Sequence, residues 1–326
     1  MKNLFFVSMT SMFITLSIIS CQKSVETAPA PVGPAELAGA ARVSNSQDDP
    51  GKVQRKFITV RNISLSYLEA NADRKNTIFF IHGNSSSAQA WEKQLTNPEL
   101  SDYRLIAFDL PAHGESGASE TPDEDYSAID LGKILAEAAS SLTTGKFIIG
   151  GISLGSSITG EMLANNLDPA GIFLASSTCV GEGITLDKIS QPGVDLSFLF
   201  SDDAPVSTIE AYASLASFSP DQNDRQQIVQ DYFHVKAPFR STLLNTLIAG
   251  KIGNEIKLIE DQHKPVLVIF GNEDQILKPD HLDNAPFELW KGKVFKLPNS
   301  SHFVNLDDPK TFSHLLSAYA EEQFQK

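Results

Sequence analysis

The sequence is poor in cysteine and carries no basic stripe. It contains only Cys21 and Cys179, so at most one disulfide can form, and none can form if Cys21 is modified. The formal net charge of -14 and the dispersed acidic residues argue against a nucleic-acid partner. No group of His, Cys, Asp or Glu has the spacing of metal ligands, and the chain has no internal repeat. We therefore predict no metal, no other cofactor and no nucleic acid.

The N-terminus has no hydrophobic run of the roughly 20 residues that span a membrane comfortably. A positive start at Lys2 is followed by an apolar stretch at residues 4–19, which the run Ile-Ile-Ser-Cys at 18–21 closes. This run resembles the bacterial lipobox, which implies cleavage before Cys21 and a lipid on its thiol. We therefore expect residues 1–20 to be a lipoprotein signal peptide and Cys21 to anchor the protein to a membrane of the bacterial cell envelope. The alternative is an ordinary secretory signal in which Cys21 is incidental.

Two regions of different composition follow the leader. Residues 21–51 are rich in Ala, Pro, Ser and Gly and cannot bury enough apolar surface to fold, so they are expected to form a flexible tether. The folded body is expected at residues 52–326. The chain as a whole is 41% hydrophobic and 20% charged, as is ordinary for a globular protein. Cys179 follows a predicted strand and is expected to be a small buried hydrophobe rather than a catalyst.

Short apolar runs alternate with segments of helical period in the folded body. This pattern is typical of an α/β fold with a mostly parallel sheet covered by helices. The alternation stops at about residues 181–262, where aromatic and acidic residues predominate, and an inserted cap is the best account of this stretch. Strands are predicted at residues 57–60, 63–68, 77–81, 105–108, 146–149, 171–174, 266–270 and 294–297, and helices near 88–95, 129–135, 158–163 and 312–319.

The run Gly151-Ile152-Ser153-Leu154-Gly155 follows one of these strands directly. A serine hydroxyl is a poor nucleophile unless a base takes its proton and the backbone exposes its oxygen. Glycines two residues to either side allow a strand and a helix to pass closely while the serine occupies a strained turn. The pentapeptide therefore nominates Ser153 as a nucleophile, although the motif alone also occurs in ordinary glycine-rich loops.

Polar residues that could serve this serine follow two later strands. In open parallel sheets, functional groups gather at the carboxyl ends of the strands. Asp274 lies just after the strand at 266–270, and His302 lies on the loop after the strand at 294–297. The histidine could therefore reach Ser153, and Asp274 could hold its other ring nitrogen.

With these residues in place, the chain resembles the α/β-hydrolase family from about residue 55 onward. The order Ser153, Asp274, His302 matches the family's order of nucleophile, acid and base. Two further landmarks are the run His-Gly-Asn at 82–84 and the run Asp-Leu-Pro-Ala-His-Gly-Glu-Ser at 109–116, each after a strand. The resemblance implies an α/β-hydrolase fold with a mostly parallel central sheet, flanking helices and an inserted cap or lid.

The expected roles follow from the chemistry of acyl transfer. Ser153 attacks an acyl carbon, His302 accepts and later returns the proton, and Asp274 fixes the tautomer of the histidine. The backbone N–H of Leu154 lies at a helix start, where negative charge is favoured, and would donate to the oxyanion. By the family's pattern, the second donor is the backbone N–H of Asn84.

Several alternatives stay open at this stage. Glu273 adjoins Asp274 and is a second choice for the acid, whereas His82 and His113 are expected to hold loops and His281 to face solvent. We expect hydrolysis of a small, mainly apolar carboxylic ester or thioester. Hydrolysis of an amide, a lactone or a carbon–carbon bond uses the same triad, as does a perhydrolase, and a binding protein that lost catalysis is the non-enzymatic alternative. A serine in place of an aspartate nucleophile argues against dehalogenation.

Overall fold

The computed structural model describes residues 52–326, so the predicted signal peptide, Cys21 and the tether at 21–51 lie outside the described residues. Eight strands form one sheet in the order β1-β2-β4-β3-β5-β6-β7-β8. β2 is antiparallel to both of its neighbours, and the other neighbouring strands are parallel. The strands are β1 Gln54–Val60, β2 Ile63–Ala70, β3 Thr77–Ile81, β4 Arg104–Phe108, β5 Phe147–Ser153, β6 Gly171–Ser177, β7 Val266–Gly271 and β8 Phe295–Leu297. Each predicted strand is present, with shifted ends, and the sheet confirms the predicted α/β fold with a mostly parallel sheet.

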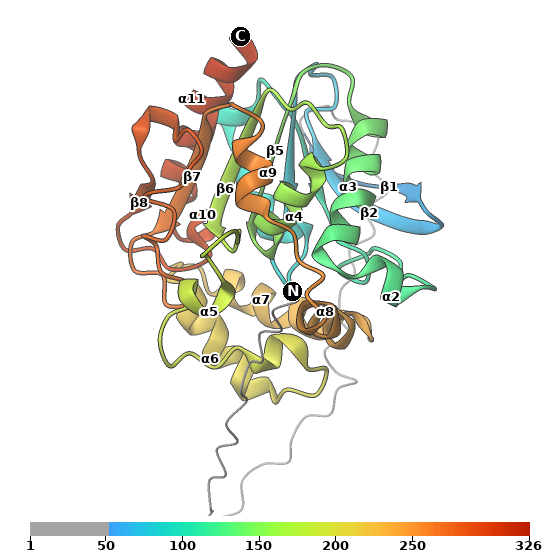
Figure 1. The fold of residues 1–326 in the computed structure, drawn as a ribbon. Helices are drawn as coiled ribbons and strands as arrows, with labels where there is room; N and C mark the ends of the chain where they lie inside the picture. Colours follow the sequence, from blue (N-terminus) through green and yellow to red (C-terminus); the bar gives the residue numbers. More distant parts are fainter. Residues whose placement is uncertain (1–51) are drawn as a thin grey trace, which may run out of the picture. The chain divides into compact units, whose positions relative to one another are not determined.

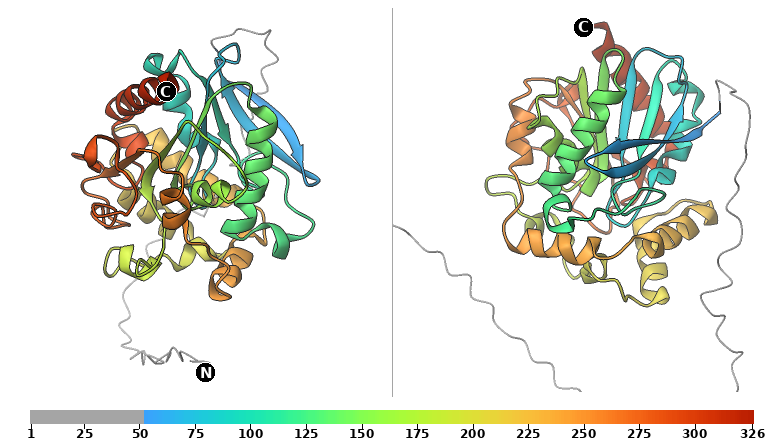
Figure 2. Two further views of the ribbon diagram at one scale, coloured as in Figure 1. Left: turned by 45° about the horizontal axis from the view of Figure 1, so that its top comes forward. Right: turned by 90° about the vertical axis from the view of Figure 1, so that its right-hand side faces the viewer.

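Helices cover both faces of the sheet (Figures 1 and 2). One group packs together on one face and consists of α3 Ala128–Leu142, α4 Leu154–Leu163 and α9 Glu255–Glu260. The other group consists of η1 Ala88–Trp91, α1 Glu92–Leu95, α10 Val304–Asp307 and α11 Pro309–Gln325. The helix expected near 88–95 is therefore a 3-10 turn followed by one α-helical turn. Short elements in the connections are η2 Pro98–Leu100, α2 Pro122–Asp125 and η4 Trp290–Gly292.

An aromatic cluster joins the sheet to the second group of helices. The ring of Trp91 lies 5.0 Å from that of Phe80 in β3, 6.1 Å from that of Phe173 in β6 and 5.9 Å from that of Phe312 in α11. All four side chains are fully buried. Because large aromatic side chains bury much apolar area, this cluster fixes α11 and η1 against the middle of the sheet.

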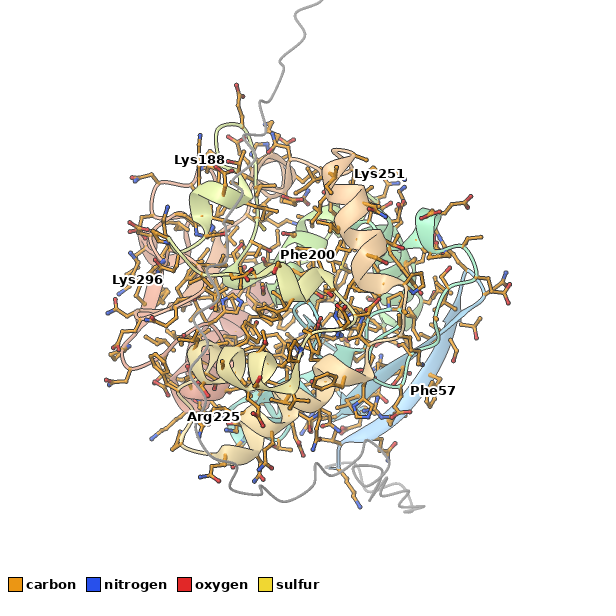
Figure 3. All side chains as sticks on the ribbon, turned by 90° about the horizontal axis from the view of Figure 1, so that it is seen from below. Phe57, Lys188, Phe200, Arg225, Lys251 and Lys296 are labelled. Carbon is orange, nitrogen blue, oxygen red and sulfur yellow. The ribbon has the colours of Figure 1, made fainter. Side chains whose placement is uncertain are left out.

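The segment between β6 and β7 contains helices and no strand of the sheet. Four helices and one 3-10 turn lie beyond the carboxyl ends of the strands, and we call them the cap helices (Figure 1). They are α5 Leu186–Ile189, η3 Ser197–Phe200, α6 Val206–Ala216, α7 Gln222–His234 and α8 Phe239–Ile248. Figure 3 views this side and places Phe200 near its middle, with Lys188, Arg225 and Lys251 around it. The last helix of the segment, α9, instead packs on α4 beside the sheet.

Candidate active site

Ser153 occupies the junction between β5 and α4 in a conformation that side-chain-bearing residues rarely adopt. Its backbone angles are φ 53° and ψ -127°. Such a conformation costs on the order of 1–3 kcal/mol and persists only where the surroundings enforce it. Here the carbonyl of Ser153 accepts hydrogen bonds from the hydroxyls of Ser156 (2.6 Å) and Thr178 (2.7 Å). Two side-chain donors therefore hold the strained peptide in place.

The two glycines of the pentapeptide are required by space. A Cβ on Gly155 would lie 2.3 Å from the carbonyl oxygen of Ile81, and one on Gly151 would lie 2.7 Å from the same oxygen. A Cβ on Gly151 would also lie 2.5 Å from the carbonyl of Gly155. Side chains at these positions would push α4 away from β3 and β5. The reason given above for the glycines, close passage of strand and helix, is confirmed.

His302 and Asp274 form a buried pair at the ends of neighbouring strands. The Nδ1 of His302 lies 3.0 Å from Oδ2 of Asp274, and each of the two residues is 1% exposed. The other carboxylate oxygen accepts the backbone N–H groups of Ile276 (2.8 Å) and Leu277 (2.9 Å). Because these amides fix one oxygen, the other is aimed at the imidazole. Because Nδ1 carries the proton that it donates to Asp274, Nε2 of the neutral ring is unprotonated and can accept a hydrogen bond.

Neither Nε2 of His302 nor Oγ of Ser153 has a hydrogen-bond partner in the part of the chain that the structure describes. Ser153 is half-buried at the junction of β5 and α4. Glu273, the alternative acid, is exposed and accepts the N–H of Asn299 instead (3.2 Å). The geometry therefore brings Asp274, and not Glu273, to the histidine.

The loop after β3 passes directly beside Ser153. A Cβ on Gly83 would lie 3.1 Å from Cβ of Ser153 and 3.7 Å from its Oγ. Asn84 follows on this loop and is half-buried, while Leu154 is the first residue of α4. The two predicted oxyanion donors thus lie on the two segments that flank the serine. We refer to residues 82–85 as the oxyanion loop.

The two early histidines hold this loop by hydrogen bonds. His82 accepts the N–H of Leu110 on Nε2 (3.0 Å) and donates from Nδ1 to the carbonyl of Gly83 (2.7 Å). His113 accepts the N–H of Ser85 on Nε2 (3.3 Å). Burial lowers the pKa of both rings, that of His113 well below its usual value, so both stay neutral and can accept. Their expected loop-holding role agrees with these contacts.

The prediction that His281 faces solvent is wrong. Its ring is half-buried and lies edge-on to Phe270, with 5.3 Å between the ring centroids. Burial lowers the pKa of this imidazole. The surrounding sequence is polar, but the loop folds back over the end of β7, which local composition does not reveal.

The loop that carries His302 is bonded to the end of cap helix α6. The hydroxyl of Ser301 donates to the carbonyl of Leu215 (2.6 Å), and the N–H of Phe303 donates to the carbonyl of Ala216 (2.8 Å). The carboxylate of Asp307 accepts the N–H of Ser301 (2.7 Å) and two donors from the residues directly after α6. The cap is therefore attached to the histidine loop on both sides of His302.

Sequence reasoning missed three residues that the structure places around the site. Ser156 and Thr178 hold the carbonyl of Ser153, and the hydroxyl-rich run at 176–178, at the end of β6, was the available signal. Tyr212 of α6 packs on Phe198, with 5.0 Å between the ring centroids. Burial, and then the charge of Asp274, raise the pKa of Tyr212, which therefore remains a neutral phenol.

The remaining features of residues 52–326 concern metal ligands, membrane-spanning helices and the buried cysteine. Over this range, no group of three or more His, Cys, Asp or Glu side chains could hold a metal ion. Within the same residues, no helix has the length and apolarity needed to cross a membrane. Cys179 is fully buried, and burial raises its thiol pKa to about 12, so it is an inert packing residue as predicted.

Comparisons with known proteins agree with this architecture. A profile of the family described as "Alpha/beta hydrolase family" matches residues 78–315. An uncharacterized hydrolase of Bacillus subtilis (strain 168), YugF, is 23% identical over 278 residues, covering 81% of this chain and 97% of that protein. The dihydrolipoyllysine-residue acetyltransferase component of an acetoin cleaving system from Pseudomonas putida is 22% identical over 269 residues. That match covers 78% of this chain and spans 66% of the component's length.

Solved structures share the fold at low sequence identity. The N-acyl homoserine lactonase AidH, complexed with N-butanoyl homoserine, has a TM-score of 0.77 and 22% identity, covering 84% of this chain and 98% of that one. A thermophilic esterase has a TM-score of 0.57 and 22% identity, covering 83% of this chain and 99% of that one. Each likeness covers more than four fifths of this chain and nearly the whole of the other protein.

Proposed function

Because this chain belongs to the alpha/beta hydrolase family and is a hydrolase, we propose that it cleaves a small, mainly apolar carboxylic ester or thioester through an acyl-enzyme intermediate. The observations that support the proposal are the buried pair of His302 and Asp274, 3.0 Å apart, and the strained turn at Ser153, which follow parallel strands at the same edge of the sheet. A strained serine, an oriented imidazole with a free Nε2 and flanking backbone donors are the parts that acyl transfer needs.

The proposed reaction has two halves. The oxygen of Ser153 bonds to the acyl carbon while Nε2 of His302 takes the hydroxyl proton, and the N–H groups of Leu154 and Asn84 bind the oxyanion. The oxyanion then collapses, the bond to the alcohol or thiol breaks, and His302 returns the proton to that leaving group. Water repeats the sequence on the acyl-enzyme and releases the acid. Asp274 holds the tautomer and stabilises the imidazolium throughout.

Aromatic side chains of the cap support the apolar character of the substrate. Phe198 and Tyr212 pack together, and Tyr212 lies within electrostatic range of Asp274. Aromatic rings provide apolar area with a polar handle, which suits the acyl chain and the carbonyl of an ester. The fold shared with a lactonase and an esterase adds cyclic esters to the substrates worth testing.

A fluorophosphonate probe tests the nucleophile directly. We expect the purified chain to be labelled and a Ser153→Ala variant to be silent. Ser141→Ala, at an exposed position on α3, is the matched control and should label like the parent. Equal labelling of the parent and Ser153→Ala, or no labelling of the parent, would show that the nucleophile is misassigned.

A substrate panel tests the bond and the size of the acyl group. We expect turnover of p-nitrophenyl esters with short acyl chains to exceed that of long chains, and N-acyl homoserine lactones extend the panel to cyclic esters. Absence of turnover on every ester, thioester and lactone would favour a binding protein.

We also propose that Cys21 carries a lipid and holds the enzyme in the bacterial cell envelope. The lipobox-like run at 18–21 supports this placement. Expression of the full chain with an alkyne-labelled fatty acid should label the parent and not Cys21→Ser. Loss of labelling should be accompanied by a shift from the membrane to the soluble fraction, and an unlabelled parent would refute the anchor.

A further inference from the structure

We infer that Arg240 of cap helix α8 is a positioning residue that holds the oxyanion loop in its working conformation. The inference rests on the proposed function, because it assigns a task to a residue outside the triad. Through its bond to Ser85, Arg240 joins two segments that lie 155 residues apart in the sequence, the cap and the loop after β3.

Arg240 is a buried cation whose guanidinium is fixed on several sides. The residue is 2% exposed, and its carbon Cζ lies 3.8 Å from the centroid of the Tyr232 ring. One terminal nitrogen donates to the carbonyl of Tyr232, and the other lies 3.0 Å from Oδ1 of Asp202. Nε donates to the hydroxyl oxygen of Ser85 at 3.0 Å. Because stacking and two anchors fix the plane of the guanidinium, the direction of the bond to Ser85 is also fixed.

A chain of hydrogen bonds continues from Ser85 to the proposed oxyanion donor. The hydroxyl of Ser85 donates to Oδ1 of Asn84 at 3.0 Å. The amide nitrogen of the same Asn84 side chain donates to the carbonyl of Leu199 in the cap, also at 3.0 Å. Both ends of the Asn84 side chain are thus held, one through Arg240 and one by the cap directly. The backbone N–H of Asn84 lies on the segment that these bonds orient.

Ser85 itself is in a conformation that needs support. Its φ of 57° is in the left-handed region, which side-chain-bearing residues such as serine rarely occupy. Its N–H is held by the neutral His113 and its hydroxyl oxygen by Arg240. Removal of the arginine leaves one of the two tethers on a strained residue that adjoins Asn84. Relaxation there would move an oxyanion donor, and displacements of about 1 Å cost large factors in rate.

A purely structural role for Arg240 makes a different prediction. If the arginine only fastened α8 to Tyr232 of α7 and to Asp202 of the segment after η3, its loss would lower stability and leave the chemistry of the folded fraction unchanged. A positioning role lowers kcat with little change in KM, because an oxyanion donor acts in the transition state more than in the bound substrate. Affinity for a trifluoromethyl ketone, which forms a tetrahedral oxyanion on the serine, should fall in parallel.

The experiment compares two variants that break the hydrogen-bond chain from Arg240 through Ser85 to Asn84, the path variants, with one variant that changes the cap alone. Arg240→Met keeps the packing of the stem, and Ser85→Ala removes the acceptor while Arg240 stays in place. Arg225→Met in α7 is the matched control, since Arg225 donates within the cap to the carbonyl of Ser219. We expect kcat on a p-nitrophenyl ester to fall by roughly tenfold to a hundredfold in each path variant, as for loss of a hydrogen bond to a charged group.

Further measurements distinguish a positioning role of Arg240 from a purely structural one. Inhibition by the ketone should weaken by a similar factor, and the double variant should lose little more than either single one. Arg240→Lys should recover part of the loss. The inference would be overturned if the path variants are folded, as judged by circular dichroism, and keep both kcat and ketone affinity within about twofold of the values for Arg225→Met. A parent with neither turnover nor fluorophosphonate labelling would instead refute the proposed function, and the inference with it.

Discussion

Replacing Glu255 with glutamine should stabilise the protein by an amount that grows as the pH rises. Glu255 begins α9 and is fully buried against Glu161 of α4. One of its oxygens accepts the N–H of Val180 at 2.8 Å. The remaining Oε1 atom of each glutamate is buried and has no hydrogen-bond donor in the described chain. A proton shared between the two carboxyls would satisfy both, so the folded state favours the protonated pair.

The magnitude follows from the shift in titration. Burial, and then the charge of Glu161, raise the pKa of Glu255 to about 9, from 4.5 in an unfolded chain. Between these two pH values the folded state binds one more proton than the unfolded state. The contribution of Glu255 to the unfolding free energy is therefore fully present below pH 4.5 and is lost as the pH rises toward about 9. The slope is about 1.4 kcal/mol per pH unit, or about 4 kcal/mol from pH 5 to pH 8 at most. Asp130 and Lys133 of α3 also act on Glu161, with opposite signs.

Glutamine removes this pH-dependent loss of unfolding free energy because its side chain cannot ionise in the unfolded chain. Its carbonyl can accept from Val180, and its amide can donate to Glu161. Urea unfolding at about pH 5, 6.5 and 8 should show the advantage of Glu255→Gln over the parent widening by a few kcal/mol. Glu260→Gln, on the same helix and bonded to Lys257, should differ from the parent by a constant amount. An advantage for Glu255→Gln that does not change with pH, or that shrinks as pH rises, would refute the shared proton.

Three further predictions concern the turn, the buried thiol and the acid. Gly155→Ala would place a Cβ 2.3 Å from the carbonyl oxygen of Ile81, so we expect a loss of about 1–3 kcal/mol in unfolding free energy and of fluorophosphonate labelling; an unchanged melting temperature would contradict this. Burial raises the pKa of Cys179 to about 12, so iodoacetamide at pH 8 should leave it unmodified in the folded protein and alkylate it in urea, as mass spectrometry can measure. Asp274→Asn should keep the fold and lower kcat on the order of a thousandfold or more by disturbing the tautomer of His302, and a loss of less than tenfold would argue against the acid assignment.

The sequence predicted those parts of the molecule that local patterns encode. The alternation of apolar runs located every strand, and the rule that functional groups follow strand ends directed attention to Asp274 and His302, which the fold brings to 3.0 Å. The glycines at 151 and 155 were interpreted correctly because their task, close backbone passage, is local. In each case the signal lies within a few residues of the feature.

Contacts between distant segments had no such signal. Arg240 meets Ser85, and Leu215 meets Ser301, only because the cap folds back over the strand ends. Nothing in the periodicity of α8 marks one arginine as buried, and arginine is usually exposed. The place of α9 beside α4 was missed for the same reason, since a six-residue helix carries too little pattern to show which neighbour it packs on.

The bonds between α6 and the histidine loop bear on attempts to change the substrate range by exchanging caps with relatives. Residues 215–218 and 301–307 act as one joint, because Ser301 and Phe303 donate to carbonyls at the end of α6 and Asp307 accepts from the residues that follow it. A chimera cut between these segments would leave the loop of His302 with foreign partners. The exchangeable unit therefore includes this loop together with the cap, and libraries that vary the cap should keep the joint intact.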